Sequence, residues 1–359
     1  MKHFRFSIIF TLICLALSAY WGFTHGVEAG VSTMLNAVAI TGILAVMEVS
    51  LSFDNAIVNA SVLKTWDHFW RTMFLTVGIL VAVFGMRLLF PLVIVGVTAD
   101  MGLIEVAKLA LNDPKTYSEK LISHHAEIAA FGGVFLLLVF LNFLFDEEKD
   151  THWFHWFETK MSSLANIQAM SVFVSLIALL VMSANVAEAS RLAVTVAGIW
   201  GIVVYVGVEV LGHLLEGESD EEDEAEDKAP SSNVTSNVAK AGIGGFIYLE
   251  VLDASFSFDG VIGAFAITSD VVIIMLGLAI GAMFVRSLTV YLVEQGTLDE
   301  FVYLEHGAHY AIGALALIML ASGTGAHIPE VVTGLIGIAF IVWAVISSIT
   351  FNKKELQNS

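Results

Sequence analysis

The stretch "EVSLSFDNAIVNA", from Glu48 to Ala60, places two acids, two serines and two asparagines inside a run that is otherwise apolar from Val31 to Leu63. The chain as a whole is hydrophobic, since 57% of its 359 residues are apolar and 14% are charged. The apolar residues form blocks of about 20, which is the length of a helix that crosses a bilayer. The sequence therefore predicts an all-α, polytopic membrane helix bundle that buries polar groups.

Nine or ten helices are expected to cross the membrane. They are expected near residues 5–22, 33–63, 70–97, 127–145, 167–184, 190–214, 242–267, 270–293, 305–322 and 330–350. The first has a signal-like basic start, but "ALSAYWG" is a poor cleavage site and favours an uncleaved anchor. Lysine and arginine divide ten against four between the two sides, which predicts cytoplasmic N- and C-termini.

These spans divide the chain into six segments. They are an N-terminal anchor or signal-like span (1–30), a first transmembrane repeat with an outer segment at 98–123 (31–146), an inserted interfacial segment and helix pair (147–215), an acidic cytoplasmic linker (216–240), a second transmembrane repeat (241–323), and a C-terminal span and tail (324–359). The run "EGESDEEDEAEDK" is too charged to pack and predicts disorder in the linker. The single cysteine excludes an intramolecular disulfide and a thiolate metal cluster.

The opening motif occurs twice. "EVSLSFDN" at residues 48–55 matches "DASFSFDG" at residues 253–260 in the spacing of its acids, serines and phenylalanine. The span after each copy also matches, because "GILVAVFGMR" ends at Arg87 and "GLAIGAMFVR" ends at Arg286. The third span begins with histidines in both copies, which aligns His125 with His306.

The repeat has a predicted geometry. Five crossings separate the two copies, so they run through the membrane in opposite directions and form an inverted repeat. Such a repeat brings the two motifs together near the bilayer midplane, where transporters place the substrate site.

Buried charge is the main chemical feature. Five acids lie within apolar spans, namely Glu48, Asp54, Glu250, Asp253 and Asp259. Each charge at the centre of a span costs about 2.5 to 3.5 kcal/mol on insertion scales. Arg87 and Arg286 neutralise at most two acids, so interhelical ion pairs alone leave a surplus that protons or a bound cation would balance.

A cation site suits these residue types. Carboxylate, hydroxyl and amide oxygens favour Mn²⁺, Mg²⁺ or Ca²⁺ over copper or zinc. The candidate ligands are Glu48, Asp54, Asn55, Glu250, Asp253 and Asp259. Residues expected around the ion or along its path are Ser50, Ser52, Ser255, Ser257, Arg87, Arg286, His125 and His306.

The spacing of the acids restricts how they share a site. Six residues on an ideal helix turn through 600°, so Glu48 and Asp54 point about 120° apart, as do Asp253 and Asp259. Either the helices unwind at Asn55 or Gly260, with Gly260 the favoured position, or the acids serve different steps of a pathway.

At these residues the sequence resembles the TerC family of the LysE transporter superfamily. The matching segments are "MEVSLSFDNAIVNASVLKTW" and "GILVAVFGMRLLF" in the first half, and "YLEVLDASFSFDGVIGAFAIT", "GAMFVRSLTVYLVE" and "YLEHGAHYAIGALALIML" in the second. The resemblance implies a protein of the bacterial cytoplasmic membrane, linked to tellurite resistance and to export of divalent metal, especially manganese. It also implies that the candidate ligands above hold the ion and that the two arginines balance charge.

The leading hypothesis is a proton-coupled exporter of a divalent cation and not an enzyme. An intramembrane aspartyl hydrolase, a membrane scaffold or accessory protein, and an exporter of organic solutes are the alternatives. The expected partners are the cation, protons and the lipid bilayer, with no nucleic acid, and homo-oligomerisation stays open. The stretch "HWFHWFETK", His152 to Lys160, is typical of an aromatic belt at a membrane interface.

Overall fold

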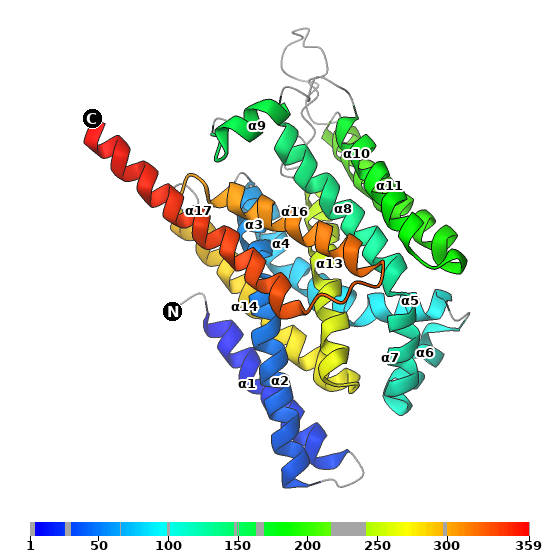
Figure 1. Cartoon of the computed structure of the whole chain (residues 1–359). Helices are drawn as coiled ribbons and strands as arrows, with labels where there is room; N and C mark the ends of the chain where they lie inside the picture. The colour runs from blue at the N-terminus through cyan, green and yellow to red at the C-terminus, as the bar shows by residue number, and fades with distance from the viewer. Residues whose placement is uncertain are drawn as a thin grey trace.

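A computed structural model describes residues 4–25, 30–64, 66–98, 101–146, 149, 151–162, 169–216, 242–296 and 300–358. All secondary structure in these residues is helical (Figure 1). The helices are α1 (Arg5–Thr24), α2 (Val31–Leu51), α3 (Phe53–Leu63), α4 (His68–Leu80), η1 (Val81–Leu89), α5 (Phe90–Thr98), α6 (Leu103–Asn112), α7 (Pro114–Ser123), α8 (His125–Phe145), α9 (His155–Ser162), α10 (Met170–Asn185), η2 (Glu188–Ser190), α11 (Arg191–Glu216), α13 (Ile243–Ile267), α14 (Val271–Gln295), α16 (Leu304–Ser322) and α17 (Glu330–Asn358).

The helices confirm the polytopic bundle. A helix lies in each of the ten expected ranges, and eight helices of the described residues are long and apolar enough to cross a membrane. The shorter α10 and the acid-bearing α13 occupy the other two ranges. The expected outer segment forms the short helices α6 and α7. Of the linker predicted at 216–240, residue 216 ends α11 and residues 217–240 lie outside the described residues.

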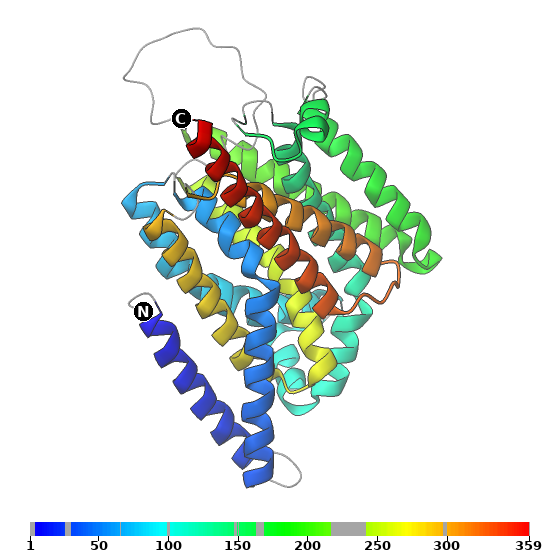
Figure 2. The same ribbon diagram turned by 60° about the vertical axis from the view of Figure 1, so that its left-hand side comes forward.

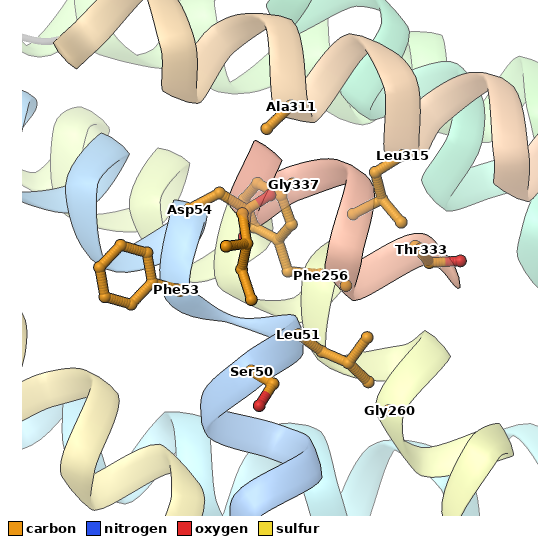
Figure 3. Close-up of a pocket in the computed structure, with 12 residues that line it drawn as sticks. Ser50, Leu51, Phe53, Asp54, Phe256, Gly260, Ala311, Leu315, Thr333 and Gly337 are labelled. Atoms are coloured by element: carbon orange, nitrogen blue, oxygen red, sulfur yellow. The ribbon is translucent and has the colours of Figure 1, made fainter. Parts of the chain in front are cut away.

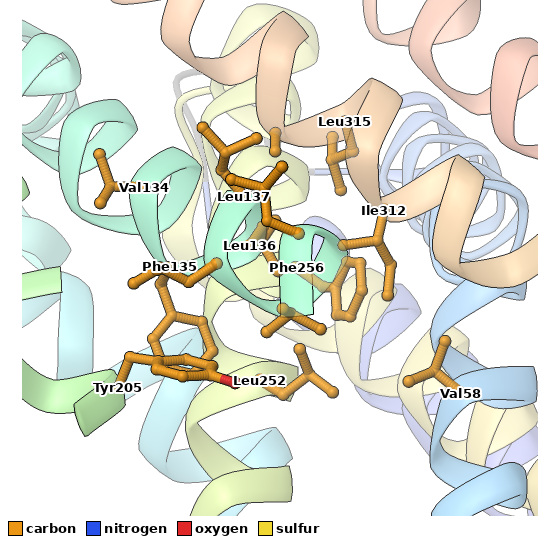
Figure 4. Packing of buried hydrophobic residues seen from close by; sticks show 14 of the residues in the cluster. Val58, Val134, Phe135, Leu136, Leu137, Tyr205, Leu252, Phe256, Ile312 and Leu315 are labelled. Atoms are coloured by element: carbon orange, nitrogen blue, oxygen red, sulfur yellow. The ribbon is translucent and has the colours of Figure 1, made fainter. Parts of the chain in front are cut away.

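The centre of the bundle is α8. This helix is apolar on all sides, and 83% of its most apolar stretch is buried between α16, α11 and α10, as expected of a helix without a polar face. Figure 4 shows Leu136 and Leu137 of α8 among Phe256 of α13 and Ile312 and Leu315 of α16. Lipid is as apolar as leucine, so close packing rather than removal from water holds this core together.

The edge of the bundle is formed by α1, which packs on α2 and α14 and extends with the start of α2 beyond the other helices (Figures 1 and 2). Its outer face exposes Phe6, Ile9 and Leu12, side chains that suit contact with lipid. Its inner face uses small polar groups, since the hydroxyl of Ser7 donates to the carbonyl of Met283 (2.8 Å). Such residues commonly hold membrane helices together.

Packing follows the inverted repeat. In the first copy, α2 and α3 pack on α14 and α3 packs on α16. In the second copy, α13 packs on η1 and on α8, which are the equivalent elements of the first copy. The third helices, α8 and α16, pack on each other. This exchange of partners is what a two-fold relation between two three-helix units produces.

The helix break does not lie at the position that the sequence predicted. The second copy was expected to unwind at Gly260, but α13 continues without interruption from Ile243 to Ile267. The break lies in the first copy, where α2 ends at Leu51 and α3 begins at Phe53. Ser52 occupies the break, and its hydroxyl donates to the carboxylate of Glu48 one turn earlier. The role of Gly260 is to let Glu48 approach α13 closely, because an added Cβ would lie 2.7 Å from Oε2 of Glu48.

The contact between α2 and α14 yields a prediction. A Cβ added at Gly277 of α14 would lie 2.6 Å from Cβ of Leu44 and 3.0 Å from the carbonyl of Thr41. We expect Gly277→Ala to lower the free energy of unfolding, measured by titration with SDS in mixed micelles, by about 1–3 kcal/mol. Gly42→Ala is the control, because nothing lies within 4 Å of its added Cβ, and it should be neutral or stabilising. Equal effects of the two substitutions would contradict this packing.

Candidate cation site between the two repeats

The two acidic motifs cross in antiparallel fashion. Glu48 of α2 lies against Gly260 of α13, and Nδ2 of Asn55 donates to Oδ1 of Asp253 (2.5 Å). Glu48 aligns with Asp253 in the repeat, and Asn55 aligns with Gly260, so each contact is the symmetry equivalent of the other. The structure therefore brings the motifs together in the crossing that the inverted repeat predicts.

A buried ion pair occupies the first half of this crossing. Nη2 of Arg87 pairs with Oε1 of Glu48, and both side chains are almost completely buried. The hydroxyl of Ser52 donates to the same carboxylate oxygen (3.1 Å). Arg87 comes from the π-helical stretch η1, a rare geometry that often marks functional sites, and it also donates to the carbonyl of Ala82 (2.7 Å).

The second arginine is held less directly. Nη2 of Arg286 lies 3.9 Å from Oε1 of Glu250 and donates to the carbonyl of Phe74. Cζ of the same guanidinium group lies 3.8 Å from the centre of the Phe74 ring. Neither carboxylate oxygen of Glu250 has a hydrogen-bond partner in the described part of the chain. This ion pair is therefore looser than the pair of Arg87 with Glu48.

Both guanidinium groups border one small cavity. Its volume is about 10 Å³, and its polar lining consists of Asn59, Arg87, Asp253, Arg286 and Thr289. A single water needs about 10–15 Å³, so this space holds one water at most. Two guanidinium groups and one carboxylate, that of Asp253, line this cavity, so its walls carry a net positive formal charge.

Asp54 faces a different cavity, of about 20 Å³ (Figure 3). The walls come from α2, α3, α13, α16 and α17, and they include the hydroxyl residues Ser50 and Thr333 together with Gly260 and Gly337. Oδ1 of Asp54 accepts a hydrogen bond from the backbone N–H of Asn55 (3.0 Å). Among the described residues, no basic side chain pairs with Asp54, and no basic group lines its cavity.

The formal charges show the size of the imbalance. Among the side chains that the structure describes, four carboxylates are buried here, those of Glu48, Asp54, Glu250 and Asp253, together with the guanidinium groups of Arg87 and Arg286. Four negative and two positive charges leave a formal charge of −2. One divalent cation or two protons would neutralise the cluster.

The acids do not form one cage. Among the described residues, no three His, Cys, Asp or Glu side chains lie close enough together to hold a metal ion. The side chain of Asp259 lies outside the described residues, although its backbone belongs to α13. Asp54 and Asp253 line separate cavities, which favours the alternative in which the acids serve successive steps.

The serines divide into two kinds. Only Ser52 bonds to a candidate acid side chain, Glu48. The hydroxyls of Ser50, Ser255 and Ser257 donate to backbone carbonyls one turn earlier in their own helices. The sequence pattern cannot separate these cases, because a helical serine always has a carbonyl of its own helix within reach.

The histidines lie elsewhere. His125 is the first residue of α8 and is half-buried. His306 of α16 is buried and donates through Nε2 to the carbonyl of Thr151 (2.9 Å), in a cluster around Glu158.

Sequence reasoning missed Glu158 because it interpreted the surrounding stretch as an aromatic belt. The signal that could have identified it was a single acid among Trp, Phe and His. It also missed α17 as a wall of the Asp54 cavity, although "TGLIG" places two small residues three apart.

The ion pair of Arg87 yields a prediction. Arg87→Met keeps most of the side-chain volume but leaves Glu48 buried without its partner, and we expect a loss of about 3–5 kcal/mol in the free energy of unfolding. Adding Glu48→Gln should recover most of that loss, whereas the exposed Arg191→Met should have little effect. The measurement is SDS titration in micelles, and a double variant as unstable as Arg87→Met would contradict a net ion-pair role.

Comparisons with known proteins agree with a membrane protein. A relative described as "Uncharacterized membrane protein YceF", from Bacillus subtilis (strain 168), is 30% identical over 153 residues, which are 42% of this chain and 57% of the relative. The chain therefore spans less than two thirds of that relative's length. No solved structure matches the chain. Residues 53–355, well over half of the chain, match the family model described as "Protein of unknown function (DUF475)", and the chain belongs to this family.

Proposed function

We propose that this protein is a secondary transporter that exports a divalent metal cation, manganese foremost, across the bacterial cytoplasmic membrane. The observation that carries the proposal is the formal charge of −2 left by four buried carboxylates and two guanidinium groups at the crossing of the repeats. Burying that charge without a counter-ion is costly in a low-dielectric interior. A doubly charged ion matches the deficit.

The cation is proposed to bind first at Asp54. This carboxylate has no basic partner in the described part of the chain, and its cavity has room for an ion that has shed most of its water. Oxygen donors suit Mn²⁺, Mg²⁺ and Ca²⁺. The cavity beside Asp253 is lined by two guanidinium groups, which repel a metal ion as long as they stay in place.

Further support comes from the motifs and their crossing. The acidic motifs resemble those of the TerC family, which implies manganese export and a link to tellurite resistance. Antiparallel repeats that meet at a polar site are typical of transporters that alternate access between the two sides of a membrane. The distribution of lysine and arginine supports cytoplasmic termini. Protons are the proposed counter-ion, because carboxylates that lose a cation in a low dielectric are disfavoured in the charged form.

An intramembrane aspartyl hydrolase gains no support from the described acids. Such an enzyme needs two carboxyl groups that share a proton. The candidate pair is Asp54 and Asp259, and the side chain of Asp259 lies outside the described residues.

Transport by the purified protein tests the proposal. In proteoliposomes, the full chain should carry Mn²⁺ at a rate that changes with an imposed pH gradient. Asp54→Asn should lower the initial rate at least about tenfold, which corresponds to about 1.4 kcal/mol in the activation free energy. Asp113→Asn is the matched control, because it changes an exposed helix cap to another good cap. Wild-type rates in Asp54→Asn would refute the assignment.

A further inference from the structure

Another buried acid, outside the site between the repeats, lies near the end of α8 and the start of α16. Glu158 of α9 is fully buried, and its carboxylate accepts hydrogen bonds from the backbone N–H groups of Trp153 (3.2 Å) and Phe154 (3.3 Å) and from the hydroxyl of Tyr310 (3.0 Å). A carboxylate with this many donors fixes the backbone and side chains that supply them.

Two basic groups complete the cluster. Nε2 of His306 lies 3.6 Å and Nζ of Lys149 lies 4.0 Å from Oε2 of Glu158. Burial lowers the pKa of Lys149, and the attraction of Glu158 opposes that shift. The contacts of Glu158 with His306 and Tyr310 tie α9 to α16, so the cluster joins an extramembrane segment to the transmembrane bundle.

Aromatic rings extend the same attachment to α17. The rings of Trp153 and Phe154 lie 5.2 and 5.3 Å from the ring of Trp343, and 5.8 and 5.2 Å from that of Tyr310. Tyr310 in turn stacks on Phe340 of α17 at 6.1 Å. The segment 151–158 therefore covers the contact between α16 and α17 at Tyr310, Phe340 and Trp343.

This aromatic layer lies next to the Asp54 cavity. Tyr310 directly precedes Ala311, and Phe340 follows Gly337 by one helical turn; Ala311 and Gly337 both line the cavity. A Cβ at Gly337 would lie 3.6 Å from Oδ2 of Asp54. The stacked rings of Tyr310 and Phe340 therefore lie beside the walls that α16 and α17 give to the cavity.

We propose that residues 151–162 form a gate over the Asp54 cavity and that Glu158 is the positioning residue that holds it closed. Tyr310 connects the gate to the cavity. Its hydroxyl donates to Glu158 of the gate, and its ring stacks on Phe340 between α16 and α17. The part of this inference that concerns transport rests on the proposed function. Opening requires Tyr310 to leave Glu158, which exposes the cavity to the side on which α9 lies.

Thiol labelling tests the gate without any assumption about the ion. The full chain in lipid nanodiscs carries Cys14→Ala and Ala311→Cys, and reacts with a membrane-impermeant maleimide. Adding Glu158→Ala should raise the labelling rate about tenfold, and Glu105→Ala, an exposed acid of α6, should leave it unchanged. Tyr310→Phe removes only the hydroxyl and should shift the rate in the same direction, which covers the case in which Glu158→Ala does not fold. Equal labelling rates in the Tyr310→Phe, Glu105→Ala and parent proteins would overturn the proposal.

A reversible cross-link tests the role of the gate in transport. Trp153→Cys and Trp343→Cys, joined by a short bis-methanethiosulfonate, should lower Mn²⁺ transport at least tenfold, and dithiothreitol should restore it. The matched pair Ser183→Cys and Thr195→Cys, whose hydroxyls lie 2.7 Å apart in α10 and α11, should have no effect. Full transport by the cross-linked gate would overturn its role. Absence of transport in the wild-type protein would instead refute the proposed function, and the labelling rates alone would then decide whether the gate exists.

Discussion

Negative charge outnumbers positive charge in a part of the protein where neither is well solvated, and the surrounding architecture accommodates that excess. Among the described side chains, four carboxylates and two guanidinium groups are buried where the two repeats cross. Arg87 pairs with Glu48, and Arg286 lies 3.9 Å from Glu250, so each arginine neighbours an acid of its own repeat. Asp54 has no basic partner among the described residues, and it lines a cavity whose walls carry no basic group. Buried ion pairs that only tied helices together would not require such an unmatched acid.

Close packing makes this arrangement possible. Glu48 fits between α13 and α14 because the residues facing it are Gly260 and Gly281; a Cβ at Gly281 would lie 2.5 Å from Cγ of Glu48. Beyond the break at Ser52, Asp54 faces the cavity that α16 and α17 help to wall. The ion pair of Glu48 consequently lies between the two cavities, with Gly260 lining one and Arg87 lining the other.

Much of the fold could be predicted from the sequence, because in a membrane the length of an apolar block and the parity of the crossings constrain the arrangement strongly. The helices, the inverted repeat and the meeting of the motifs follow from these two features. The position of the helix break could not be predicted in this way. Gly260 suggested that α13 unwinds, whereas this glycine makes room for the side chain of Glu48. The partners of Glu158 and the contribution of α17 depend on contacts between segments distant in the chain, and periodicity carries no information about them.

The proposed transport depends on a divalent cation beside Asp54. The most direct measurement is a structure of the protein determined with Mn²⁺ present, with anomalous scattering recorded at the manganese absorption edge. We expect an anomalous peak in the cavity between Asp54 and Gly337, with the Asp54 carboxylate as a ligand. Manganese found only outside the bundle, with Asp54 paired to a basic side chain instead, would contradict a cation site at Asp54.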